Sequence, residues 1–84
     1  MMREAMPTAE RTASDPAAAR FVERIEHFVR MRTGGMIHGL HVEVGGDRVI
    51  LTGRTSTFYS KQLATHATLD LLDDQTLNNL IEVD

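Results

Sequence analysis

The hydrophobic period of the chain changes once, at Gly34-Gly35, and this change constrains the fold class more than any other feature. Before it, residues 17–32 carry apolar side chains at helical spacing, which predicts an amphipathic helix. After it, residues 40–44 and 48–53 alternate apolar and polar side chains, which predicts two strands. The link Gly45-Gly46-Asp47 is typical of a hairpin turn, in which Gly45 and Gly46 supply positive φ angles. A helix followed by a hairpin indicates an α+β domain.

The first helix has clear start and stop signals. Asp15 followed by Pro16 is typical of an N-cap and a first helical position. Gly34 and Gly35 are typical of a C-terminal end. Its predicted inner face consists of Ala18, Phe21, Val22, Ile25, Phe28, Val29 and the stem of Arg32. Residues 1–14 are small, polar and aperiodic, so we expect a disordered tail there and a single domain over residues 15–84.

The second half of the chain predicts another helix and one more strand. We expect the helix to be capped by Ser56 and to end near Asp73-Asp74, with an inner face of Ser60, Leu63, Ala64, Ala67 and Leu71. The strand places Leu77, Asn79, Ile81 and Val83 on one side. The order α-β-β-α-β predicts a two-layer sandwich in which two helices cover one face of a three-stranded mixed sheet. The other face carries His41, Glu43, Arg48, Ile50 and Thr52, which we expect to be wet.

The composition excludes several classes of protein. The chain has 84 residues and no cysteine, so it has neither a disulfide framework nor a thiolate metal site. No apolar run approaches the roughly 20 residues of a membrane span, and the N-terminal stretch lacks the core of a secretory signal. These absences predict a cytoplasmic location. The net charge is −3, and residues 55–84 hold Lys61 alone against five acids, so we expect no nucleic-acid partner.

The pattern GLHVEVGGDRVILTGRTSTFYSKQLATHA, followed by LNNLIEV, resembles the BON domain, a small α-β-β-α-β module of bacterial osmotic-stress, secretin-associated and channel-associated proteins. The resemblance covers roughly residues 20–84 and is carried by the steps V-x-L-T-G and N-x-I-x-V. It implies a non-enzymatic binding module that acts at phospholipid surfaces. Many relatives are periplasmic, which differs from the cytoplasmic location predicted above. Asp73-Asp74 stands where the family usually has Gly-Val, and Thr55 stands where it often has valine.

No motif in the chain points to catalysis, a cofactor or a metal. The stretch GGDRVILTGRTS has the wrong spacing for a phosphate-binding loop, and its residues are better explained as turn, strand and helix start. We expect Gly53 to let a helix approach the sheet. His38 and His41 are three apart on a strand, which predicts opposite faces. The hydroxyls near His66 have no triad geometry, and Asp70, Asp73 and Asp74 do not form a calcium loop. We therefore predict a protein that is not an enzyme.

Two surfaces are candidates for binding. Arginines of the first helix could contact anionic phospholipid, and apolar side chains outside the predicted core could form a contact patch. The candidate residues are Arg24, Arg30, Arg32, Phe58, Tyr59, Leu69 and Leu72. The pair Leu69 and Leu72 could also tuck against the following loop. Two functions stay open: a module at anionic phospholipid surfaces, or a protein-interaction or homodimerisation module without lipid binding. The net negative charge and the lack of a basic helix with aromatic anchors weigh against the first.

Overall fold

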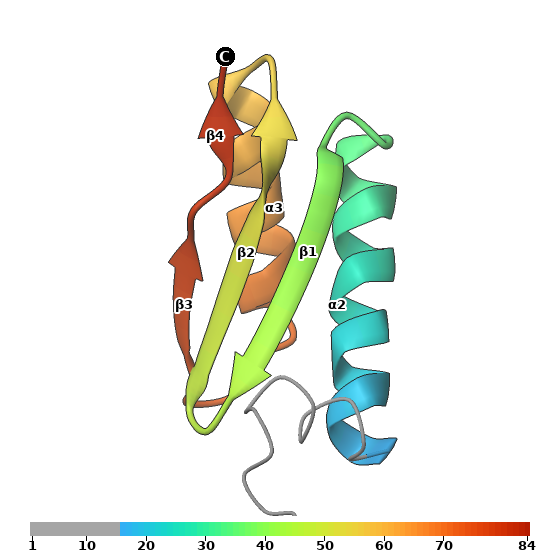
Figure 1. The fold of residues 1–84 in the computed structure, drawn as a ribbon, viewed down its shortest axis with the longest axis vertical. Helices are drawn as coiled ribbons and strands as arrows, with labels where there is room; N and C mark the ends of the chain where they lie inside the picture. The colour runs from blue at the N-terminus through green and yellow to red at the C-terminus, as the bar shows by residue number, and fades with distance from the viewer. Residues whose placement is uncertain (1–15) are drawn as a thin grey trace, which may run out of the picture.

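Two helices and a mixed sheet follow one another in the predicted α-β-β-α-β order, so the α+β class is confirmed (Figure 1). The computed structural model describes residues 16–84, and the predictions for the tail 1–14 and for Asp15 as a cap lie outside this part of the chain. The elements are α2 (Pro16–Thr33), β1 (His38–Gly45), β2 (Arg48–Thr55), α3 (Phe58–Leu69), β3 (Thr76–Asn79) and β4 (Glu82–Val83). Helix α2 ends directly before Gly34 and Gly35, which have φ angles of 62° and 76°.

Strand β2 is the centre of the sheet. It pairs with β1 in antiparallel register, with Val42 opposite Leu51, and with β3 and β4 in parallel register. Helix α3 connects β2 to β3 and packs on these strands, whereas α2 packs on β1 and on α3. Both helices therefore cover one face, as predicted, and His41, Glu43 and Arg48 lie on the other.

The core lies between the helices and the sheet. Its largest completely buried apolar side chains are Ile25, Val29, Val49, Leu51 and Ile81. The alternation of buried and exposed residues along β2 is the reason for this, because Val49, Leu51 and Thr55 face the helices. Burial of such side chains is the main favourable contribution to the stability of a domain of this size.

Three threonines are buried in this layer, and they differ in their hydrogen bonds. The hydroxyls of Thr33 and Thr68 donate to the carbonyls of Val29 and Ala64, each at 2.8 Å. The hydroxyl of Thr55 has no hydrogen-bond partner within residues 16–84, although the residue is only 1% exposed. An unpartnered buried hydroxyl lowers the stability of the fold.

The predicted third strand is interrupted into β3 and β4. Both pieces keep the same offset to β2, since Leu51 lies opposite Asn79 and Arg54 lies opposite Glu82. The interruption coincides with a side-chain contact: the N–H of Ile81 donates to Asn79 Oδ1 at 3.0 Å. The amide nitrogen of Asn79 donates to Lys61 O at 3.0 Å and to Thr65 Oγ1 at 2.8 Å. Asn79 therefore ties the strand to α3 and also supplies an acceptor for the N–H of Ile81.

The hairpin turn and Gly53 differ in detail from the sequence-based expectation. Only Gly46 of the turn has a positive φ angle, 62°, so the expectation for Gly45 is wrong. Gly53 has a φ of 149°, and a Cβ atom there would lie 3.0 Å from Ile37 Cγ2 and 3.1 Å from the carbonyl oxygen of His38. Its close neighbour is therefore the start of β1, and the expected approach of a helix is not found.

A β-bulge explains this close approach. Gly39 and Leu40 together oppose Gly53, because the register shifts between the pairs His38–Arg54 and His41–Thr52. Gly39 has a φ of 63°, which is the conformation of the first residue in a glycine bulge. Because Arg54 and Thr52 share one face of β2, His38 and His41 also share a face. The expectation that they take opposite faces is wrong, since the extra residue changes the parity of the strand.

The N-cap of α3 is Thr57 instead of Ser56. The side-chain oxygen of Thr57 accepts a hydrogen bond from the N–H of Ser60 at 3.1 Å, and its hydroxyl donates to Ser60 Oγ at 2.9 Å. This geometry is the usual way to satisfy a free N–H in the first turn of a helix. The cap places Phe58 and Tyr59 in the first two positions of α3.

Candidate functional site

Exposed apolar side chains gather at one end of the molecule. The end of α2, the start of β1, the end of β2, the start of α3 and the end of β4 all lie at this end (Figure 1). Five of the seven large apolar side chains that are exposed within residues 16–84 come from these segments. We call them the apolar tip: Met31, Met36, Phe58, Tyr59 and Val83.

The local structure explains why the two aromatic side chains are exposed. Side chains of a helix tilt toward its N-terminus, so residues in the first turn project past the helix end. Phe58 and Tyr59 occupy this position in α3 and are 60% and 70% exposed. Met36 follows Gly35 in the short connection between α2 and β1 and is 50% exposed. The tip is thus built from a helix start and a loop that nothing in the described fold buries.

The arginines near the tip differ in how well they are paired. Arg30 is exposed in the last turn of α2, and no described residue is its ion-pair partner. Arg54 faces two carboxylates, with Nη2 3.7 Å from Glu82 Oε1 and Nε 4.0 Å from Asp84 Oδ1. The tip therefore combines apolar surface with one arginine, Arg30, that has no ion-pair partner among the described residues.

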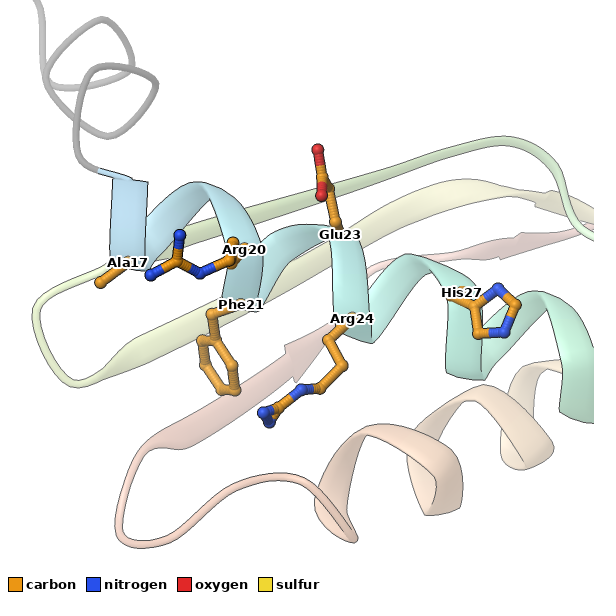
Figure 2. Close-up of a pocket in the computed structure, with 6 residues that line it drawn as sticks. All are labelled: Ala17, Arg20, Phe21, Glu23, Arg24 and His27. Carbon is orange, nitrogen blue, oxygen red and sulfur yellow. The ribbon is translucent and has the colours of Figure 1, made fainter.

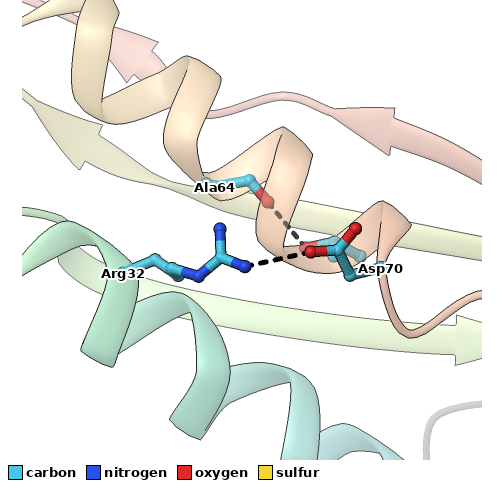
Figure 3. Close-up of polar contacts among 4 residues, drawn as sticks. Arg32, Ala64 and Asp70 are labelled. Atoms are coloured by element: carbon cyan, nitrogen blue, oxygen red, sulfur yellow. Dashed lines mark hydrogen bonds and ion pairs between the residues drawn. The ribbon is translucent and has the colours of Figure 1, made fainter.

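Arg32 joins the two helices. Its Nη2 donates to Asp70 Oδ2 at 3.0 Å, and its guanidinium carbon lies 5.0 Å from the centroid of the Phe28 ring (Figure 3). The sequence offers no reason for an acid at the C-terminal end of a helix, because the helix dipole disfavours it there. The contact with Arg32 supplies this reason for Asp70. Arg32 is consequently engaged in the structure, and of the three predicted arginines it is the least available to a ligand.

The predicted binding residues do not form one surface. Phe58 and Tyr59 at the start of α3 and Arg30 in the last turn of α2 belong to segments at the tip end, whereas Arg24 lies in the N-terminal half of α2. Leu69 is 49% exposed at the far end of α3, and Leu72 packs partly against the core. Leu72 is therefore less exposed than Leu69, and a contact of the pair with the following loop stays a prediction.

Sequence reasoning missed Met36 and Val83 as members of the tip. Met36 is one apolar residue in a glycine-containing link, and the alternation of the last strand predicts that Val83 faces the core, but it is 40% exposed. The pairing of Thr55 with Val83 brings the C-terminal strand to this end of the sheet. Only a prediction of the parallel register between β2 and the last strand could have found this proximity.

The stretch that resembles a phosphate-binding loop is a hairpin turn and a strand. Gly46 lies in the turn and Gly53 lies within β2, so the residues between them are extended along β1 and β3. Within residues 16–84 there is no group of three or more histidine or acidic side chains that could hold a metal ion. No helix in this part of the chain is long and apolar enough to cross a membrane.

Comparisons of the chain with protein-family models, with curated proteins and with solved structures gave no match.

Proposed function

We propose that the chain is a non-enzymatic, BON-like binding module that contacts an anionic phospholipid surface through the apolar tip. The observation that carries this proposal is the gathering of five exposed large apolar side chains at one end of the fold. Exposed apolar side chains that are concentrated in one region of a globular domain are typical of a site of interaction.

The composition of the tip suits the interface of a bilayer. Tyrosine has an apolar ring and a polar hydroxyl, and such side chains concentrate at the level of lipid headgroups. Phe58 and Met36 are apolar throughout and can enter the acyl region. Each side chain that is fully removed from water contributes about 1.5–3 kcal/mol, so partial insertion of three of them gives binding that is reversible. Arg30 can contact lipid phosphate at the edge of the tip.

The charge distribution orients the domain on such a surface. Asp47 lies in the turn between β1 and β2, and Asp73 and Asp74 lie between α3 and β3, at the end opposite the tip (Figure 1). Helix α2 runs between the two ends, and its 18 residues span about 27 Å. This length exceeds the screening distance of about 8 Å at physiological ionic strength. The acidic end therefore adds little repulsion at the tip, where Glu82 and Asp84 offset Arg54 and Arg30 has no ion-pair partner among residues 16–84.

Vesicle co-sedimentation tests this proposal. We expect the chain to pellet with phosphatidylcholine vesicles that contain phosphatidylglycerol, and the double variant Phe58→Ser, Tyr59→Ser to stay in the supernatant. Leu69→Ser is the matched control, because Leu69 is also exposed but lies outside the tip. If the unmodified chain stays in the supernatant at low salt, the lipid proposal is wrong.

The same tip also supports a second candidate, a protein-interaction or homodimerisation module. An exposed patch with two aromatic side chains is typical of the centre of a protein interface. Light scattering separates the two functions. A dimer that the double tip variant abolishes, together with no binding to vesicles, favours the second candidate, and a monomer that binds vesicles favours the first.

A further inference from the structure

A second feature lies on the N-terminal half of α2, away from the apolar tip. It is an open hollow of about 630 Å³, within the size range of small-molecule sites. The described residues that line it are Ala17, Arg20, Phe21, Glu23, Arg24 and His27 (Figure 2). None of these residues belongs to the tip, so binding at the hollow is independent of the proposed phospholipid contact.

Two guanidinium groups at the hollow have no acceptor within the described part of the chain. Arg20 and Arg24 are exposed, and neither has an ion-pair or hydrogen-bond partner among residues 16–84, in contrast to Arg32 and Arg54. They are four residues apart on one helix, where like charges destabilise the helix. His27 adds an imidazole one turn further on. Two unpaired guanidinium groups on successive turns of one helix form a surface that an anion can bridge.

The number of donors indicates which anion fits. One guanidinium fork satisfies both oxygens of a carboxylate, so two forks offer more donors than one carboxylate needs. The three terminal oxygens of a phosphate monoester match this set. The Phe21 ring extends on the same side of α2 as the Arg24 side chain, whereas Glu23 points to the other side (Figure 2). The ring packs in part against the core, and the part that stays exposed can contact an organic group beside the phosphate.

We propose that this hollow binds a small, soluble phosphate monoester with an apolar or aromatic organic group. Arg20 and Arg24 hold the phosphate, and Phe21 contacts the organic group. A lipid headgroup could supply the same phosphate. A soluble ester fits better, because Arg24 is nine residues before the end of α2, about 14 Å along the helix, and a domain seated on its tip holds the hollow away from the bilayer.

An NMR titration with phenyl phosphate tests the proposal. We expect saturable shifts of the Nε–H signals of Arg20 and Arg24, and a loss of affinity of about tenfold in Arg20→Gln and in Arg24→Gln, the size expected for one charge-assisted hydrogen bond. Arg48→Gln is the matched control, because Arg48 is exposed on the sheet face that the helices do not cover, and it leaves the affinity unchanged. Glu23→Gln tightens binding two- to threefold, roughly, because it removes the negative charge at the rim.

Several outcomes would overturn this assignment. One is the absence of saturation by phenyl phosphate at low salt. Another is an equal response of Arg30 and Arg54, which indicates unspecific screening. A third is benzoate binding as tightly as phenyl phosphate, which indicates a carboxylate site. Retention on vesicles containing phosphatidic acid that is lost in Arg24→Gln, without binding of phenyl phosphate, refutes the soluble ester and assigns the lipid source. The double tip variant retains phenyl phosphate binding, so the two proposals can fail separately.

Discussion

Replacing Thr55 by valine is expected to stabilise the fold. Thr55 is 1% exposed at the end of β2, and its hydroxyl is the one buried side-chain polar atom within residues 16–84 that has no hydrogen-bond partner. In the unfolded chain this hydroxyl bonds to water, so folding loses that bond without replacement. Valine has almost the same shape and presents a methyl group instead. It is also the residue that the BON pattern often has at this position.

The size of the effect follows from the burial. Desolvating an unpartnered hydroxyl costs about 1–3 kcal/mol in proteins, and a buried methyl adds up to about 0.8 kcal/mol. Because part of this is lost to imperfect packing, we expect Thr55→Val to raise the free energy of unfolding by about 1–2 kcal/mol. For a domain of this size, each kcal/mol raises the melting temperature by about 4–8 °C.

Urea unfolding followed by far-ultraviolet circular dichroism measures this change. The midpoint should rise at an unchanged slope, since the surface exposed on unfolding stays the same. Thr55→Ser keeps the hydroxyl and removes the methyl, so it should destabilise the fold. Thr68→Val removes a hydroxyl that already donates to Ala64 O, so it should gain less than Thr55→Val. If Thr55→Val is neutral or destabilising, or if Thr68→Val gains as much, the reasoning about the missing partner is refuted.

Two further predictions concern the packing of β1 and the contact between the helices. Gly53→Ala should destabilise the fold by about 1–3 kcal/mol from backbone strain alone, because residues with a side chain rarely adopt its φ of 149° and because the new Cβ meets β1. Gly45→Ala has open space around it and should be neutral. Equal midpoints in urea for the two variants would contradict this prediction. A double-mutant cycle of Arg32→Ala and Asp70→Ala should give a coupling energy of about 0.2–1 kcal/mol, because the two side chains are 41% and 58% exposed. A coupling energy that stays the same in 1 M salt would argue against an ion pair, because the screening length there is about 3 Å.

Local patterns were sufficient to predict most of the fold. The alternation around Val42 and Leu51, the glycine at position 46 and the helix end at Gly34 each depend on a few neighbouring residues, and all are found as expected. The bulge at Gly39 and the interruption after Asn79 were not predicted. Both depend on which residue of another element lies opposite, and the period of one segment does not contain this information.

The site was less predictable for the same physical reason. Phe58 and Tyr59 could be recognised as exposed from helical spacing, but their neighbours at the tip, Met36 and Val83, come from segments more than 20 positions away. The position of Arg32 on α2 could be predicted from the helical spacing. Its partner Asp70 could not, because it is 38 positions further along the chain. Elements could thus be predicted singly, whereas the surfaces that they build together could not.

The bond between Ile81 and Asn79 also bears on how copies of the chain behave at high concentration. Edges of sheets can extend by adding a strand from a neighbouring molecule, which begins aggregation. Along the outer edge formed by β3 and β4, an incoming strand meets two short pieces, and between them the N–H of Ile81 is already occupied by its own chain. Growth of an intermolecular ladder through this point would have to break this bond first. A single asparagine thus helps to keep copies of the domain apart in crowded surroundings.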